Sequence, residues 1–344
     1  MFDISKIDKN FDVDTDIEKD DLKFYNINEA PFKIYGVTLE NGKYRRMPER
    51  VANNVSEGVY VLHSNTAGGR VRFTTDSSYV AIHVEMDGIG KRPHFALTGS
   101  SGFDLYDDND YIKTFIPPYE MTEGYESIVE FEKKKMRNIT INFPLYSNVS
   151  EMYIGLSDGS AVKETPSYKN SKPIVYYGSS ITQGGCASRP GMSYESILSR
   201  KLNMDYINLG FSGNAKAEDA MIEYIKTINM SAFVYDYDHN APTVEHLANT
   251  HEKMFKAIRN EKPGIPIIIM SRPKYHLNEE ETKRLHIIEA TYKNAVSSGD
   301  RNTYFIDGKA LTALCKNEGT VDGCHPTDFG FMSMAKALGE VLRE

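Results

Sequence analysis

A serine, an aspartate and a histidine in this sequence have the types and the order that nucleophilic catalysis on an ester requires. Ser180 lies in Gly-Ser-Ser-Ile-Thr, directly after the apolar residues 174–177, and Asp322-Gly-Cys-His325-Pro follows about 140 residues later. In such a set the serine attacks a carbonyl carbon, the histidine takes the serine proton, and the carboxylate orients the imidazole. The sequence therefore predicts a serine hydrolase with Ser180, His325 and Asp322 as its catalytic residues.

Three groups are candidates for binding the negative charge that develops on the substrate carbonyl oxygen. Gly213, in Gly-Phe-Ser-Gly-Asn, offers a backbone N–H with no side chain in the way. Asn240, in Asp-His-Asn-Ala-Pro, offers a side-chain amide, and the backbone N–H of Ser180 lies where a turn leads into a helix. Taken singly, a turn glycine, an asparagine before a turn and a capping serine are the more common explanations. The prediction of an oxyanion hole therefore rests on the occurrence of all three groups in one sequence.

The second half of the chain alternates short apolar runs with amphipathic stretches. Five buried strands separated by helices predict a parallel sheet with helices on both faces. In such a sheet ligands bind beyond the carboxyl ends of the strands. Ser180, Gly213 and Asn240 each follow a predicted strand, and Asp322 and His325 follow the last one. The predicted strands are 174–177, 206–209, 232–236, 267–270 and 304–306, and the predicted helices are 193–202, 217–227, 244–260, 279–297 and 331–343.

The first half has a different pattern, in which apolar and polar residues alternate over short runs separated by turn clusters. This pattern is typical of an antiparallel β-sandwich or jelly roll. The first 30 residues are charged and weakly patterned. Gly102-Phe-Asp-Leu-Tyr106 is expected to form a turn between two strands, and a loop that reaches the catalytic residues is the alternative. A polar linker, 162–173, divides the chain into expected domains 1–165 and 170–344. The predicted strands are 58–62, 69–74, 79–86, 111–116, 127–131, 138–143 and 151–156.

Composition and charge narrow the class of protein. The net charge of −8 argues against nucleic acid as a partner, because phosphate binding needs a basic surface. No apolar stretch approaches the ~20 residues of a membrane span. The N-terminus has no basic region followed by an apolar one, which favours a cytoplasmic protein. With a serine hydrolase predicted, a small-molecule ester is the expected partner, and the resemblance described below implies an oligosaccharide ester. The formation of a homo-oligomer stays open.

The sequence predicts no metal and no cofactor. Cys186, Cys315 and Cys324 are too few and too unevenly spaced for a disulfide framework or a zinc site, so reduced thiols are expected. Asp238 and His239 are adjacent but lack a third and a fourth ligand at useful spacing.

The four blocks around Ser180, Gly213, Asn240 and His325 resemble those of the SGNH/GDSL hydrolases, in the same order and over residues 170–344. The resemblance implies a flavodoxin-like three-layer α/β fold with a five-stranded parallel sheet, a serine nucleophile and no metal. Two blocks depart from the family pattern. Ser179 stands where the first block has an aspartate, and Asp-His-Asn-Ala replaces Gly-x-Asn-Asp in the third.

The N-terminal half resembles the β-sandwich domain that precedes SGNH domains in a group of bacterial proteins, and the pairing is similar to carbohydrate esterases that remove acetyl groups from sugars. The sequence thus predicts an esterase for small acyl esters, and the resemblance implies O-acetyl groups on carbohydrates. A lipase or thioesterase with the same triad, and a carbohydrate-binding protein with an inactive hydrolase half, stay open. Tyr177, Phe211, Tyr235 and Tyr237 are candidates for lining the pocket, although core positions explain several of them more readily.

Overall fold

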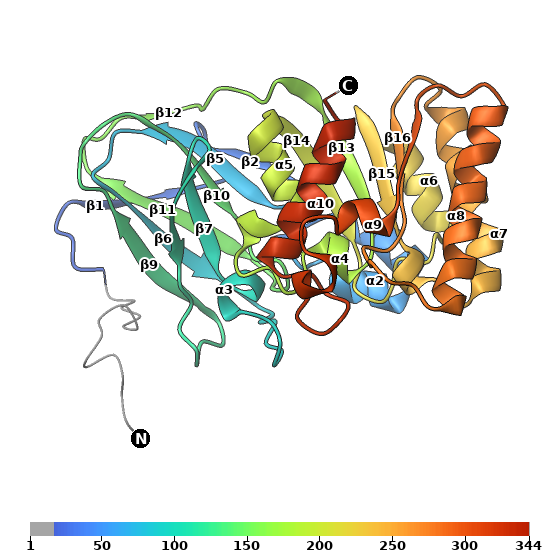
Figure 1. Ribbon diagram of the computed structural model, residues 1–344. Helices are drawn as coiled ribbons and strands as arrows, with labels where there is room; N and C mark the ends of the chain where they lie inside the picture. The colour runs from blue at the N-terminus through green and yellow to red at the C-terminus, as the bar shows by residue number, and fades with distance from the viewer. Residues whose placement is uncertain (1–16, 344) are drawn as a thin grey trace.

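The computed structural model describes residues 17–343 and shows two domains packed side by side (Figure 1). An antiparallel, strand-rich domain precedes a domain in which a parallel sheet is covered by helices, so the predicted two-domain architecture is confirmed. Part of the weakly patterned N-terminal segment, residues 1–16, lies outside the described residues. The rest of that segment includes an edge strand, β1 (Leu22–Asn26).

The N-terminal domain is a sandwich of two antiparallel sheets. Val80, Ile82 and Val84 alternate with outward-facing residues along one strand and pack against Phe73 and Ile141 of the opposite sheet. This alternation confirms the predicted all-β sandwich. One sheet has the order β1, β11 (Glu151–Ser157), β6 (Tyr79–Glu85), β9 (Gly124–Glu130), and the other has the order β12 (Val162–Lys163), β5 (Arg70–Thr75), β10 (Arg137–Asn142), β7 (Phe103–Asp107), β8 (Asp110–Phe115), with β2 (Lys33–Tyr35) also paired to β5.

Two predictions in this half are wrong. Residues 58–62 form a helix, α2 (Glu57–Leu62), which follows α1 (Glu49–Val55). The Ser56 hydroxyl caps α2 by accepting from the backbone N–H of Val59, and Val59 is buried in the core of the other domain. This packing overrides the strand preference of Val-Tyr-Val. The segment 102–106 is not a turn: Phe103–Tyr106 belong to β7, which is paired on both edges, and Gly102 directly precedes it.

The C-terminal domain has five parallel strands in the order β14 (Met204–Gly210), β13 (Asn170–Gly178), β15 (Ala232–Asp236), β16 (Ile267–Met270), β17 (Thr303–Ile306). Numbered along the chain, this is the order 2-1-3-4-5 of flavodoxin-like folds. The predicted fold class and the five predicted strands are therefore confirmed.

No helix within residues 17–343 is long and apolar enough to cross a membrane.

Helices cover both faces of this sheet (Figure 1). Ile174 and Tyr176 of β13 face one layer, and Val175 and Tyr177 face the other, so this inner strand is apolar on both sides. The helices α1 and α2 come from the N-terminal half of the chain but join the second layer, where α1 packs against α6. The first layer contains α5 (Tyr194–Leu202), α9 (Gly308–Leu311) and α10 (Asp328–Val341), and the second contains α6 (Asp219–Thr227), α7 (Val244–Glu261) and α8 (Glu279–Ser297).

A buried arginine of the sandwich joins the two domains. Arg70 of β5 is only 1% exposed, and its guanidinium forms an ion pair with Asp205 at the start of β14. It also donates to the Tyr168 hydroxyl at 2.7 Å, to the Gly68 carbonyl at 2.7 Å and to the Tyr206 carbonyl at 3.3 Å. The guanidinium is thus paired with both domains and with the linker between them.

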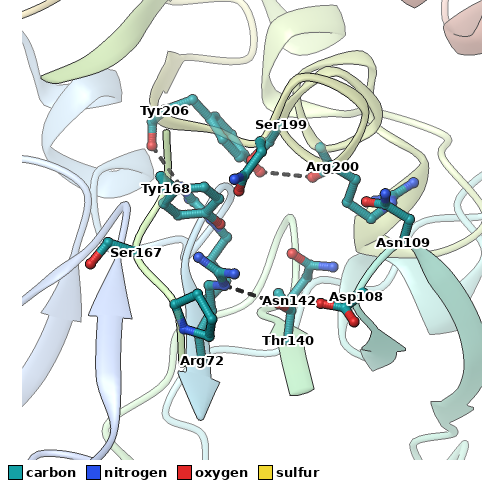
Figure 2. A pocket seen from close by; sticks show the side chains of 14 residues that line it. Arg72, Asp108, Asn109, Thr140, Asn142, Ser167, Tyr168, Ser199, Arg200 and Tyr206 are labelled. Carbon is teal, nitrogen blue, oxygen red and sulfur yellow. Dashed lines mark hydrogen bonds between the residues drawn. The ribbon is translucent and has the colours of Figure 1, made fainter. Parts of the chain in front are cut away.

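A cavity of about 270 Å³ lies beside this arginine at the domain junction. Figure 2 shows Arg72 and Tyr168 on one side of the cavity and Arg200 and Asn109 on the other. The guanidinium of Arg72 lies 4.2 Å from the centre of the Tyr168 ring. Because Tyr206 lies near the start of β14, the cavity is at the amino ends of the strands, opposite the end at which Ser180 follows β13.

We expect Arg70→Met to destabilise the protein, because it removes one member of a buried ion pair and leaves several acceptors without their donor. Breaking a buried pair in this way costs about 3–5 kcal/mol. Urea unfolding followed by circular dichroism should show a lower midpoint for this variant. Arg50→Met, at an exposed position of α1, is the control. Equal midpoints for the two variants would contradict the role given to Arg70.

Candidate active site

The predicted nucleophile lies at a sharp turn after β13, an inner strand of the parallel sheet. Strand β13 ends at Gly178, and the short helix α4 (Ser180–Gln183) begins with Ser180 itself. Ser179 caps this helix by accepting from the backbone N–H of Ile181 at 3.1 Å. Because β13 lies between β14 and β15, the turn is at the point where the strand order reverses, which is where open α/β sheets bind ligands.

The cap explains one departure from the SGNH pattern. Ser179 is fully buried and its hydroxyl is already engaged by the backbone of α4. Serine and aspartate are nearly equivalent as helix caps. A serine at this position therefore preserves the turn that presents Ser180.

Ser180, His325 and Asp322 form a continuous hydrogen-bonded chain. The hydroxyl oxygen (Oγ) of Ser180 lies 2.9 Å from Nε2 of His325, and Nδ1 of His325 lies 2.7 Å from Oδ2 of Asp322. The other carboxylate oxygen of Asp322 accepts the backbone N–H groups of His325 at 2.8 Å and of Cys324 at 3.0 Å. The structure thus brings the three predicted catalytic residues together.

The charge of Asp322 sets the tautomer of His325. Partial burial opposes the ionisation of Asp322, but the hydrogen bonds from the His325 side chain and from two backbone N–H groups lower its pKa to about 2. The carboxylate is therefore charged at neutral pH and accepts the Nδ1 proton of His325. Nε2 then carries the free lone pair, which faces the Ser180 hydroxyl.

The candidate oxyanion residues lie at the same edge of the sheet. Gly213 has φ +73°, a left-handed conformation that favours glycine, and belongs to the turn after β14. Gln183 of α4 accepts the backbone N–H of Ser212 in this turn at 3.1 Å. Asn240 donates one amide hydrogen to the carbonyl of Phe211 at 2.8 Å, and its amide carries a second donor. Within residues 17–343, no hydrogen bond joins Gly213 or Asn240 directly to Ser180.

The altered third block has a structural role of its own. Asp238 accepts two hydrogen bonds from the Arg272 guanidinium, at 2.9 and 2.8 Å, and although burial opposes its ionisation, these bonds lower its pKa. Burial and the nearby Arg272 lower the pKa of His239 to about 4, so this histidine is neutral at physiological pH. The ion pair fixes the loop that carries Asn240.

The β-sandwich contributes residues to the site that the sequence did not reveal. The Tyr146 hydroxyl donates to the carbonyl of Ser180 at 3.2 Å, and the Phe95 ring packs against Tyr146 at a centroid distance of 4.6 Å. The ring of His94 lies 5.8 Å from that of His325. Nothing in the local sequence marks these residues, because their role depends on how the domains dock.

The segment Gly102–Tyr106 also contacts the other domain, but through a strand. Asp104 is fully buried and accepts from the Arg189 guanidinium at 3.0 Å, from the Gly191 backbone N–H at 2.8 Å and from the Asn142 amide at 2.9 Å. Phe103 and Leu105 point into the sandwich core. The alternation of β7 therefore places Asp104 against the loop that follows α4.

The other candidates from the sequence lie in the core or are free thiols. The four aromatic residues near the strand ends are at most 1% exposed and belong to the core beside α6 and α7, so they do not line a pocket: Tyr177, Phe211, Tyr235 and Tyr237. All three cysteines are free. Cys186 is buried, and Cys324 lies 3.8 Å from Nδ1 of His239.

Two protein-family models match the chain. The first describes a GDSL-like lipase/acylhydrolase family and matches residues 171–343. The second, named GxDLY, describes the N-terminus of SGNH-hydrolase-type esterases and matches residues 22–162, which include Gly102-Phe-Asp-Leu-Tyr106. The chain therefore belongs to the GDSL-like lipase/acylhydrolase family and is a carboxylic ester hydrolase. No curated protein matches its sequence.

Solved structures with the same two-domain fold include enzymes of several kinds. A putative GDSL-like lipase from Bacteroides ovatus superposes with a TM-score of 0.83 at 27% identity, covering 94% of this chain and 98% of that one. A salicylyl-acyltransferase from a tetracycline biosynthetic pathway superposes with a TM-score of 0.76 at 16% identity, covering 93% of this chain and 96% of that one. A family two carbohydrate esterase from Cellvibrio japonicus superposes with a TM-score of 0.62 at 12% identity, covering 94% of this chain and 97% of that one. At these low identities the last two show the fold alone.

The contacts of Asp104 predict that Asp104→Ala loosens the loop after α4. Losing a buried charged partner costs about 3–5 kcal/mol. The amide hydrogens of residues 186–193 should therefore exchange at least about 100-fold faster, since 1.4 kcal/mol is tenfold. Hydrogen exchange followed by mass spectrometry measures this directly. Asp110→Ala, exposed on the neighbouring strand β8, is the control, and unchanged exchange in Asp104→Ala would refute the anchoring role.

Proposed function

We propose that the chain hydrolyses small acyl esters through a covalent acyl-enzyme on Ser180, with O-acetyl groups on carbohydrates as the substrates. The observation that carries the proposal is the chain of hydrogen bonds from Ser180 Oγ through both ring nitrogens of His325 to Asp322. A general base at 2.9 Å from the nucleophile, held by a charged carboxylate, is what a serine esterase needs.

In the acylation step, Nε2 of His325 takes the proton of the Ser180 hydroxyl while Oγ forms a bond to the ester carbonyl carbon. Asp322 stabilises the imidazolium that results. The oxyanion accepts hydrogen bonds from the backbone N–H groups of Ser180 and Gly213 and from the second amide hydrogen of Asn240. The intermediate then expels the alcohol oxygen, which takes the proton from Nε2.

In the deacylation step, water replaces the alcohol. His325 takes a proton from this water, and the hydroxide oxygen bonds to the acyl carbon. When the second tetrahedral intermediate collapses, the bond to Ser180 Oγ breaks and Oγ recovers a proton from Nε2. The products are the carboxylic acid and the starting enzyme, so atoms and charges balance.

A groove beside the catalytic residues supports a carbohydrate as the alcohol part of the ester. Phe95, which packs on Tyr146, also lines this groove on the β-sandwich. At its rim the Tyr119 side chain is 75% exposed, with the Lys91 ammonium 5.2 Å from its ring centre. An exposed tyrosine offers a flat face for a sugar ring in a protein that has no tryptophan. The other lining residues are Arg92, Pro93, Leu97 and Ser100.

Among the structures with this fold, a carbohydrate esterase of family two from Clostridium thermocellum was solved with cellohexaose, at 13% identity to this chain. An acetyl xylan esterase from Butyrivibrio proteoclasticus covers 93% of this chain at 14% identity. Because enzymes with this fold include sugar esterases, a sugar ester is the substrate class that we propose to test first. Preference for a long acyl chain would indicate the lipase alternative, and absence of hydrolysis would indicate the binding-protein alternative.

The first test compares p-nitrophenyl acetate, butyrate and octanoate as substrates of the parent chain and of Ser180→Ala. We expect acetate to be preferred, and kcat to fall by about 10⁴-fold or more in the variant, because loss of the nucleophile disables the whole triad. Ser297→Ala, exposed on α8, is the matched control and should retain full activity. Turnover that survives in Ser180→Ala would place the chemistry elsewhere.

Asn240→Ala tests the oxyanion hole. Loss of one such donor lowers kcat by about 10²–10³ with little change in KM, because the hydrogen bond forms fully only in the transition state. Steady-state kinetics with p-nitrophenyl acetate give both constants. A variant in which KM rises while kcat is unchanged would show that Asn240 binds the substrate without stabilising the oxyanion.

A further inference from the structure

Three side chains with metal-binding atoms converge beside the catalytic serine. Within residues 17–343, His94, Cys186 and His325 are the only group of three or more such residues whose ligand atoms all lie within 4.8 Å of one another. His94 comes from the β-sandwich, Cys186 from the segment after α4, and His325 from the loop before α10. Two imidazoles and a thiolate are donors that Zn²⁺ prefers.

The orientation of His325 suits metal binding as well as catalysis. Its Nδ1 is held by Asp322 at 2.7 Å, so the lone pair on Nε2 is free and has a fixed direction. Histidines that bind zinc are oriented by the same kind of carboxylate partner. The lone pair that takes the Ser180 proton is therefore also the one that a metal ion would use.

The backbone presents Cys186 to this cluster. The residue has φ +71°, a left-handed conformation that residues with a Cβ rarely adopt. The thiol is free and 8% exposed. The neighbouring backbone is fixed from both domains, because Ala187 donates its N–H to Gly184 at 3.2 Å and the Thr98 hydroxyl donates to the Ser188 carbonyl at 2.6 Å.

We propose that His94, Cys186 and His325 bind Zn²⁺, and that the bound ion switches the esterase off. On binding, the Cys186 thiol releases its proton to solvent, and the imidazoles of His94 and His325 each donate one lone pair to the ion. Because Ser180 Oγ lies 2.9 Å from Nε2, the hydroxyl or a water completes the four-coordinate shell. The inhibition rests on the proposed function, whereas the metal site does not.

The site would also link the two domains, since His94 belongs to one and the other two ligands belong to the other. A ligand that binds only the docked, folded state raises its stability by mass action. Zn²⁺ should therefore raise the melting temperature while it lowers the hydrolysis rate. Neither effect requires a change in the fold.

Cobalt(II) serves as the spectroscopic probe of this site in the full chain. A bound cysteine thiolate gives a near-ultraviolet charge-transfer band, and tetrahedral Co²⁺ gives strong visible bands. We expect both bands on titration, in the parent and in Ser180→Ala, and we expect Zn²⁺ to remove them. Cys186→Ser should lose the charge-transfer band. Its affinity for Co²⁺ should also fall, by more than the roughly 10–100-fold that the loss of an outer-sphere partner costs.

Two matched controls make the test specific. Cys315→Ser removes another buried thiol and should leave the bands unchanged, and His286→Gln removes an exposed histidine of α8 and should leave the thermal shift unchanged. His94→Gln should abolish the rise in melting temperature. A charge-transfer band that persists in Cys186→Ser, or the absence of both bands in the parent, would overturn the site. Bands that appear as expected in a chain that hydrolyses no ester would leave the site standing and refute only the proposed function.

Discussion

The burial of arginine side chains at the domain junction is the constraint on which the rest of the structure depends. A buried guanidinium is destabilising unless its N–H groups are paired. Arg70 is paired with Asp205 and Tyr206 only when the domains dock. Arg46 donates to the Gly210 carbonyl at 2.5 Å and to the Leu62 carbonyl at 2.6 Å, which again joins residues of both halves. These pairings fix the orientation at which the sandwich meets the parallel sheet, and the composition of the candidate active site follows from that orientation.

The α/β domain was predictable because its decisive signals are local. A strand buried on both faces is uniformly apolar, as in Ile267–Met270, and a functional residue at its carboxyl end follows it directly in sequence. The positions of Ser180 and His325 could be predicted for the same reason. The helix at 58–62 and the contribution of His94 could not, because each depends on contacts with the other domain.

The departures from the family pattern show how one fold keeps its geometry with different residues. Ser179 replaces an acid but caps α4 with its hydroxyl. Asp238, in the altered third block, is neutralised by Arg272, whose guanidinium also pairs with Glu281 of α8. Each change is matched by a local partner, so the turns that present Ser180 and Asn240 keep their shape. The sequence shows the changes, but only the structure shows the compensation.

The helices α1 and α2 have a consequence for how the chain is synthesised. They are encoded before the sandwich is complete, yet Ala52 and Val59 are buried against residues such as Leu209, Phe211 and Met221, which leave the ribosome about 150 residues later. Domains generally fold in order from the N-terminus during synthesis. The nascent sandwich therefore carries an uncovered apolar helix pair until the parallel sheet is made. The helix layer of the second domain thus includes α1 and α2, which are synthesised before that domain. These two helices can be buried only after the parallel sheet has been translated.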